Sequence, residues 1–87
     1  MKKIKLFYLR SCPYCKKALT VIEKLKEKEY KDIKLNIEMI EESQNKELAN
    51  SYDYYYVPAF FVDDKKEHEG IVMVSDIRRI IDQALRK

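Results

Sequence analysis

Residues 4–15 read IKLFYLRSCPYC, and this stretch decides the fold of the chain. Its first half is nearly continuous apolar sequence, which is typical of a short buried strand over Lys3–Leu9. Pro13 then predicts the first residue of a helix, because its missing N–H would have had no partner there. Cys12 and Cys15 therefore stand where a strand passes into a helix.

The rest of the chain alternates between helical and strand patterns. Apolar residues recur first at helical spacing and then at every second position. Further along, candidate capping residues precede two more helical stretches. The expected elements are a helix over Tyr14–Glu29, a strand over Ile33–Ile40, a short helix capped by Asn45, strands over Ala59–Val62 and Glu67–Val72 joined by a turn at Asp63–Lys66, and a last helix capped by Ser75.

The order of these elements is β-α-β-α-β-β-α, without repeats or linkers. A helix between the first two strands implies a right-handed parallel crossover. The short turn between the last two strands implies an antiparallel hairpin. We therefore predict a single α/β domain over residues 1–87, with a four-stranded mixed sheet and helices on both faces.

Composition and charge argue against several functions. Eighteen basic and fifteen acidic residues give a net charge of +3, and their alternation in sign argues against nucleic-acid binding. No stretch approaches the roughly 18 consecutive apolar residues of a membrane helix. Lys5 interrupts the N-terminal apolar run, which is then too short for a secretory signal. We expect a cytoplasmic monomer that binds neither nucleic acid nor a membrane.

The two cysteines form a Cys-x-x-Cys pair, which in a cytoplasmic protein is usually catalytic or metal-binding. The positive end of a helix favours a thiolate. Arg10, Lys16 and Lys17 add positive charge nearby, unless they are simply solvated. We expect Cys12 to be more exposed than Cys15, and this difference assigns their roles in the reaction. We expect Cys12 to be the nucleophile with a lowered pKa and Cys15 to be the buried resolving thiol.

A metal site is the alternative role for the pair. Zinc requires four ligands, and the only further candidate is His68. A dimer that bridges an iron–sulfur cluster through Cys12 is a second form of this alternative. Ligand counting favours catalysis without a metal, and we predict no tightly bound cofactor.

Cys12-Pro13-Tyr14-Cys15 resembles the dithiol motif of glutaredoxins, which belong to the thioredoxin superfamily. Asn45–Pro58 is similar to the second helix and the cis-proline approach of that superfamily, and the resemblance covers essentially the whole chain. It implies a thioredoxin fold and a thiol–disulfide oxidoreductase that reduces protein or small-molecule disulfides through Cys12 and then Cys15. It also implies a cis Val57–Pro58 peptide beside the cysteines, whose backbone pairs with an extended substrate.

The tyrosines around this peptide divide into two groups. Tyr52 and Tyr54 are expected to pack in the core, whereas Tyr55 and Tyr56 come directly before the active-site loop. The residues predicted to bind substrate are Tyr14, Tyr56, Val57 and Pro58.

The sequence departs from both relatives near the cysteines. Leu6 stands where thioredoxins bury an aspartate, so their proton relay is absent. Tyr56 replaces a glutaredoxin threonine, and Glu69-Gly70 replaces a Gly-Gly pair. Two electron sources therefore stay open. Glutathione would act as a co-substrate, whereas a flavoprotein reductase would feed a thioredoxin-like electron donor.

Overall fold

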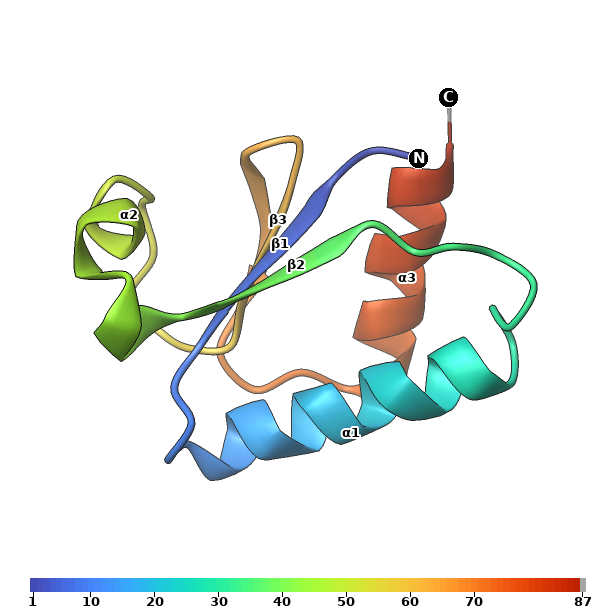
Figure 1. Cartoon of the computed structure of the whole chain (residues 1–87), viewed down its shortest axis with the longest axis horizontal. Helices are drawn as coiled ribbons and strands as arrows, with labels where there is room; N and C mark the ends of the chain where they lie inside the picture. The colour runs from blue at the N-terminus through green and yellow to red at the C-terminus, as the bar shows by residue number, and fades with distance from the viewer. Residues whose placement is uncertain (87) are drawn as a thin grey trace.

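The computed structural model describes residues 1–86, and Lys87, the last residue of the expected domain, lies outside them. The four strands within these residues form one mixed sheet in the order β2-β1-β3-β4, with β1 parallel to β2 and antiparallel to β3 (Figure 1). The predicted fold class is confirmed. The elements are β1 (Ile4–Tyr8), α1 (Pro13–Glu27), β2 (Ile37–Glu41), η1 (Glu42–Gln44), α2 (Lys46–Asn50), β3 (Ala59–Val62), β4 (Lys65–Glu69) and α3 (Val74–Leu85).

One face of the sheet packs against α1 and α3, and we call it the α1/α3 face (Figure 1). Both helices turn their apolar stripe toward the strands, as helical periodicity predicts. The buried side chains on this face are mainly aliphatic: Ile4, Leu6, Ala18, Ile22, Leu25, Phe60, Val62, Val72, Ile77, Ile80, Ile81 and Ala84, joined by Tyr30.

The opposite face is smaller and aromatic, and we call it the α2 face. Phe7 and Phe61 are buried there with Ile40, Ala49 and Ala59. Tyr52 and Tyr54 pack over Phe7, with ring centroids 4.9 and 5.1 Å from its centroid. The predicted packing role of these two tyrosines is confirmed, and helices cover both faces of the sheet.

The start of β2 differs from the prediction. Ile33 lies outside the strand and is 43% exposed, although the alternating pattern begins there. Its N–H donates to the Tyr30 carbonyl oxygen at 3.0 Å, so it still belongs to the turn after α1. Pairing with β1 begins only at Ile37, opposite Ile4. The alternating pattern therefore begins four residues before the point where β2 starts to pair with β1.

The β3–β4 hairpin turns on two residues instead of four. Asp63 and Asp64 have φ values of 48° and 66°, which is the backbone of a two-residue turn with positive φ at both positions. The strand consequently spans Lys65–Glu69, and the predicted range Glu67–Val72 is wrong. Gly70 ends the strand with a φ of 85°, a conformation that glycine adopts without strain.

Two helix caps also differ from the prediction. Met73 is the N-cap of α3, so Ser75 lies inside the helix. Asp76 supplies the capping interaction, since its carboxylate accepts from the Met73 N–H at 2.9 Å and lies at the positive end of the helix. Asn45 occupies the predicted N-cap of α2, but its side chain donates to the Glu41 carbonyl oxygen and caps nothing.

Candidate functional site

The two cysteines lie at the start of α1, just beyond the carboxyl end of β1. Cys12 is the N-cap residue, with φ −82° and ψ 119°. Its Sγ accepts a hydrogen bond from the Cys15 N–H at 3.4 Å. Both thiols are free, and Cys12 is half-buried whereas Cys15 is 1% exposed. The predicted difference in exposure is therefore confirmed.

Hydrogen bonds lower the pKa of Cys12. Burial alone raises it, but hydrogen bonds from the Cys15 thiol and from the Cys15 and Tyr14 N–H groups outweigh burial. The first-turn N–H groups of a helix have no intrahelical partner and are available to a thiolate. The side chains of the three cations near the pair are exposed, and their electrostatic role stays a prediction: Arg10, Lys16 and Lys17.

The net pKa shift of Cys15 is opposite to that of Cys12, because burial dominates at Cys15. Burial is the largest cause that raises the pKa of this thiol to about 12. The backbone of Leu9 acts against burial, whereas the neighbouring Cys12 and the negative charge of Glu42 add to the increase. The Cys15 thiol is therefore protonated at neutral pH.

Glu42 is a site residue that the sequence reasoning missed. It directly follows β2, and β2 runs parallel to β1, so it lies at the edge of the sheet where the cysteine loop begins. Its Oε1 accepts from the Tyr54 hydroxyl at 2.5 Å. The predicted parallel crossover could have indicated this residue, because the segments that follow two parallel strands lie at the same edge.

The Val57–Pro58 peptide is cis, as the resemblance implied. β3 begins directly after it, and Ala59 pairs with Phe7 near the end of β1. The cis peptide consequently lies at the edge of the sheet from which the cysteine loop leaves. The buried Pro58 accepts from the Gly70 N–H at 2.9 Å. Among residues 1–86, no hydrogen bond engages the backbone of Val57.

The family follows from a comparison with known proteins. A family model described as a thioredoxin domain matches residues 2–82. The chain belongs to the thioredoxin-domain family. No curated protein matches its sequence.

Three solved structures are similar to this thioredoxin domain. A mutant thioredoxin from Halobacterium salinarum NRC-1 is 22% identical, with a TM-score of 0.72 over 97% of this chain and 74% of that one. A malarial protein is 17% identical, with a TM-score of 0.73 over 95% of this chain and 96% of that one. An uncharacterized thioredoxin-like protein from Clostridium perfringens is 26% identical, with a TM-score of 0.68 over 98% of this chain and 71% of that one.

Two exposed tyrosines precede the cis peptide of this thioredoxin domain. Tyr55 and Tyr56 are 82% and 68% exposed. Their backbone N–H groups both donate to Glu69 Oε2, at 2.7 and 3.1 Å. Lys66 and these two N–H groups lower the pKa of Glu69 to about 2. Glu69 therefore ties the loop before the cis peptide to β4, a contact that the sequence did not indicate.

Several apolar side chains are exposed in the segments next to the cysteines and the cis peptide. Tyr14 lies in the first turn of α1 and is 53% exposed. Ile71 and Met73, in the loop after Gly70, are 61% and 62% exposed. Gly70 lies next to Tyr56, since a Cβ atom placed on Gly70 would be 3.7 Å from the Cβ of Tyr56. The predicted substrate-binding roles of Tyr14, Tyr56, Val57 and Pro58 stay predictions.

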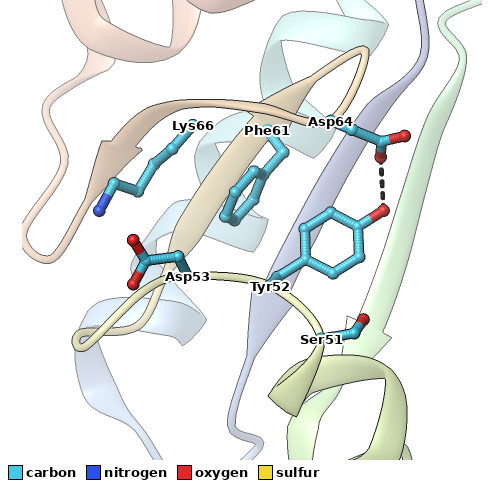
Figure 2. A pocket seen from close by; sticks show the side chains of 6 residues that line it. All are labelled: Ser51, Tyr52, Asp53, Phe61, Asp64 and Lys66. Carbon is cyan, nitrogen blue, oxygen red and sulfur yellow. Dashed lines mark hydrogen bonds between the residues drawn. The ribbon is translucent and has the colours of Figure 1, made fainter.

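A cavity of about 550 Å³ opens on the α2 face and contains neither cysteine (Figure 2). Its lining residues are Ser51, Tyr52, Asp53, Phe61, Asp64 and Lys66. The Tyr52 hydroxyl donates to the Asp64 carboxylate, and Lys5 donates to both groups. This network stabilises the hairpin end of the sheet, away from the thiols.

The structure also bears on the alternative of a metal site. Within residues 1–86, no group of three or more His, Cys, Asp or Glu side chains could hold a metal ion. His68, the third zinc ligand considered, lies on β4 with its Nε2 2.7 Å from the Ile71 carbonyl oxygen. None of the helices described is long and apolar enough to cross a membrane.

Proposed function

We propose that this thioredoxin domain is a thiol–disulfide oxidoreductase that reduces disulfides through Cys12 and then Cys15. The observation that carries the proposal is the contrast between the two thiols. Cys12 has its sulfur at the N-terminus of α1 and a lowered pKa, whereas Cys15 is buried three residues later with a raised pKa. Such a pair supplies one thiol that attacks and one that is protected until it is needed.

The reaction takes two exchange steps. The Cys12 thiolate attacks one sulfur of the substrate disulfide, and the other substrate sulfur leaves as a thiolate. A mixed disulfide then joins Cys12 to the substrate. Cys15 attacks Cys12 Sγ, which releases the second substrate thiol and leaves a Cys12–Cys15 disulfide on the protein.

The substrate is proposed to bind across the cis peptide. The backbone of Val57 has no partner among residues 1–86, so it can pair with an extended segment that carries the disulfide. Tyr14 and Tyr56 offer exposed aromatic surface nearby. Protein disulfides and small-molecule disulfides are both within this proposal.

Two electron sources are proposed for the return step. Glutathione is supported by the glutaredoxin-like motif Cys12-Pro13-Tyr14-Cys15, and a flavoprotein reductase is supported by the match to the thioredoxin-domain model. Turnover of a disulfide substrate with each reductant in turn separates the two. Rapid turnover with only one of them excludes the other as the main donor.

The two single cysteine variants test the proposed function. Cys12→Ser should abolish disulfide reduction, whereas Cys15→Ser should still attack and then stall as a mixed disulfide. Mass spectrometry after mixing with an oxidised substrate should find an adduct on Cys12 in the Cys15→Ser variant. Dithiol-type turnover by Cys12→Ser, or no adduct on Cys15→Ser, would refute the proposal.

A further inference from the structure

The second exchange step raises a chemical problem, and the inference below rests on the proposed function. Cys15 attacks only as a thiolate, yet it is 1% exposed and its proton is held at neutral pH. Bulk water has little access to this thiol. A protein group close to Cys15 that receives its proton during the attack would remove this barrier.

The groups that act on the Cys15 thiol offer few proton acceptors. Cys12 is bound to the substrate at this stage and cannot accept a proton. Leu6 on β1 is apolar and fully buried, so its side chain supplies no acceptor. Leu9 contributes only its backbone, whereas Glu42, the first residue of η1, supplies a carboxylate whose negative charge acts on Cys15.

The position of Glu42 is held from two sides. Its neighbour Glu41 accepts from the Arg10 N–H at 2.8 Å, which joins the end of β2 to the loop that carries Cys12. Tyr54 donates to Glu42 Oε1 at 2.5 Å and packs its ring on Phe7. Glu42 Oε2 has no hydrogen-bond donor within residues 1–86, so one oxygen is anchored and the other is available.

We propose that Glu42 is the proton acceptor for Cys15 and that Tyr54 is the residue that positions it. As Cys15 Sγ bonds to Cys12 Sγ, the Cys15 proton passes to the Glu42 carboxylate, directly or across one water molecule. The bond from Cys12 to the substrate sulfur breaks, and its electron pair stays on that sulfur. The proton then returns to the substrate thiolate or to solvent. The two cysteines are oxidised to a disulfide, and the substrate disulfide is reduced to two thiols.

The test separates the two exchange steps in the whole chain. Reduced protein is mixed with 5,5′-dithiobis(2-nitrobenzoic acid) in acid, where Cys12 forms a mixed disulfide and releases one thionitrobenzoate. A jump to neutral pH then starts the attack by Cys15, which releases the second one. The variants are Glu42→Gln, Glu42→Asp and Tyr54→Phe. Glu38→Gln is the control, since Glu38 lies on β2 and pairs with Lys3.

Glu42→Gln should slow the second release by about 100-fold, a typical loss for a missing general base, and leave the first release unchanged. Its second-phase rate should rise steadily with pH as Cys15 itself ionises. Glu42→Asp should restore part of the rate, and Tyr54→Phe should slow the second phase less than Glu42→Gln does. Glu38→Gln should match the wild type.

Glu42→Gln can also contradict the inference, because its amide removes the negative charge near Cys15. If Glu42 acts only through its charge, its removal lowers the pKa of Cys15, so the second phase becomes faster. An unchanged or faster second phase in Glu42→Gln overturns the inference while the exchange mechanism stands. Equal slowing of both phases indicates a structural role and also overturns it. Absence of a second release from the wild type refutes the proposed function itself.

Discussion

The two faces of the sheet are built differently. The α1/α3 face is mainly aliphatic and is covered by the two long helices. On the α2 face, α2 and the loop that carries Tyr52 and Tyr54 cover Phe7 and Phe61. The hydroxyls of these two tyrosines bind charged groups at opposite ends of the sheet. At one end Tyr52 meets Asp64 and Lys5, and at the other Tyr54 meets Glu42.

This difference indicates a division of labour. Burial of aliphatic side chains stabilises a fold without imposing particular partners. A buried ring with a polar tip packs like a phenylalanine and also fixes the direction of one hydrogen bond. We infer that the α1/α3 face supplies most of the stability and that the α2 face orients polar groups around the thiols and the hairpin.

The largest expected effect tests the role of the α1/α3 face. Ile81→Ala removes a side chain that is 1% exposed and should lower the free energy of unfolding by about 2–5 kcal/mol. Ile33→Ala is the matched control, because Ile33 is 43% exposed and should cost no more than about 0.5 kcal/mol. Urea unfolding measures both, and equal losses would contradict the division between core and turn.

A smaller effect is expected from the hydroxyl at the hairpin end. Tyr52→Phe keeps the ring on Phe7 and removes the hydrogen bonds to Lys5 and Asp64, so it should cost about 0.5–1.5 kcal/mol. Both thionitrobenzoate releases should keep their wild-type rates, in contrast to Tyr54→Phe. A slower second release in Tyr52→Phe would mean that the two ends of the α2 face do not act separately.

The smallest effect depends on pH and concerns Glu69, whose partner Ala59 lies on the α2 face. Lys66 and the two tyrosine N–H groups lower its pKa from 4.5 to about 2 in the folded protein. The stability that Glu69 contributes is therefore complete above about pH 4.5 and is lost as the pH falls toward 2. Because the Glu69 side chain is still 22% exposed to solvent, salt should weaken the effect.

Unfolding measured from neutral pH to about pH 2.5 checks this prediction. The difference in stability between wild type and Glu69→Gln should shrink as the pH falls, because protonation removes the same charge that the substitution removes. A difference that stays constant over this range would show that the carboxylate is not stabilised by its contacts in the folded state. The loss caused by Ile81→Ala, by contrast, should not depend on pH.

Local patterns in the sequence determined the architecture and the thiol pair. Apolar periodicity identified β1, β3 and both long helices, because the face that each element buries is encoded in consecutive residues. Pro13 identified the start of α1, which made Cys12 the N-cap residue and Cys15 the buried member of the first turn. The cis Val57–Pro58 peptide followed from a family resemblance, since no local pattern distinguishes it from a trans one.

Tertiary structure decided the features that join distant residues. β2 begins where β1 offers a partner, and alternation in its own sequence could not locate that point. The Glu42 carboxylate accepts from the hydroxyl of Tyr54, 12 residues away in the chain. The Glu69 carboxylate accepts from the backbone N–H groups of Tyr55 and Tyr56, 14 and 13 residues away. Such contacts depend on strand register and on the direction of side chains from different elements. Local periodicity specifies neither the register nor these directions. The groups around Cys15 could therefore be identified only from the tertiary structure.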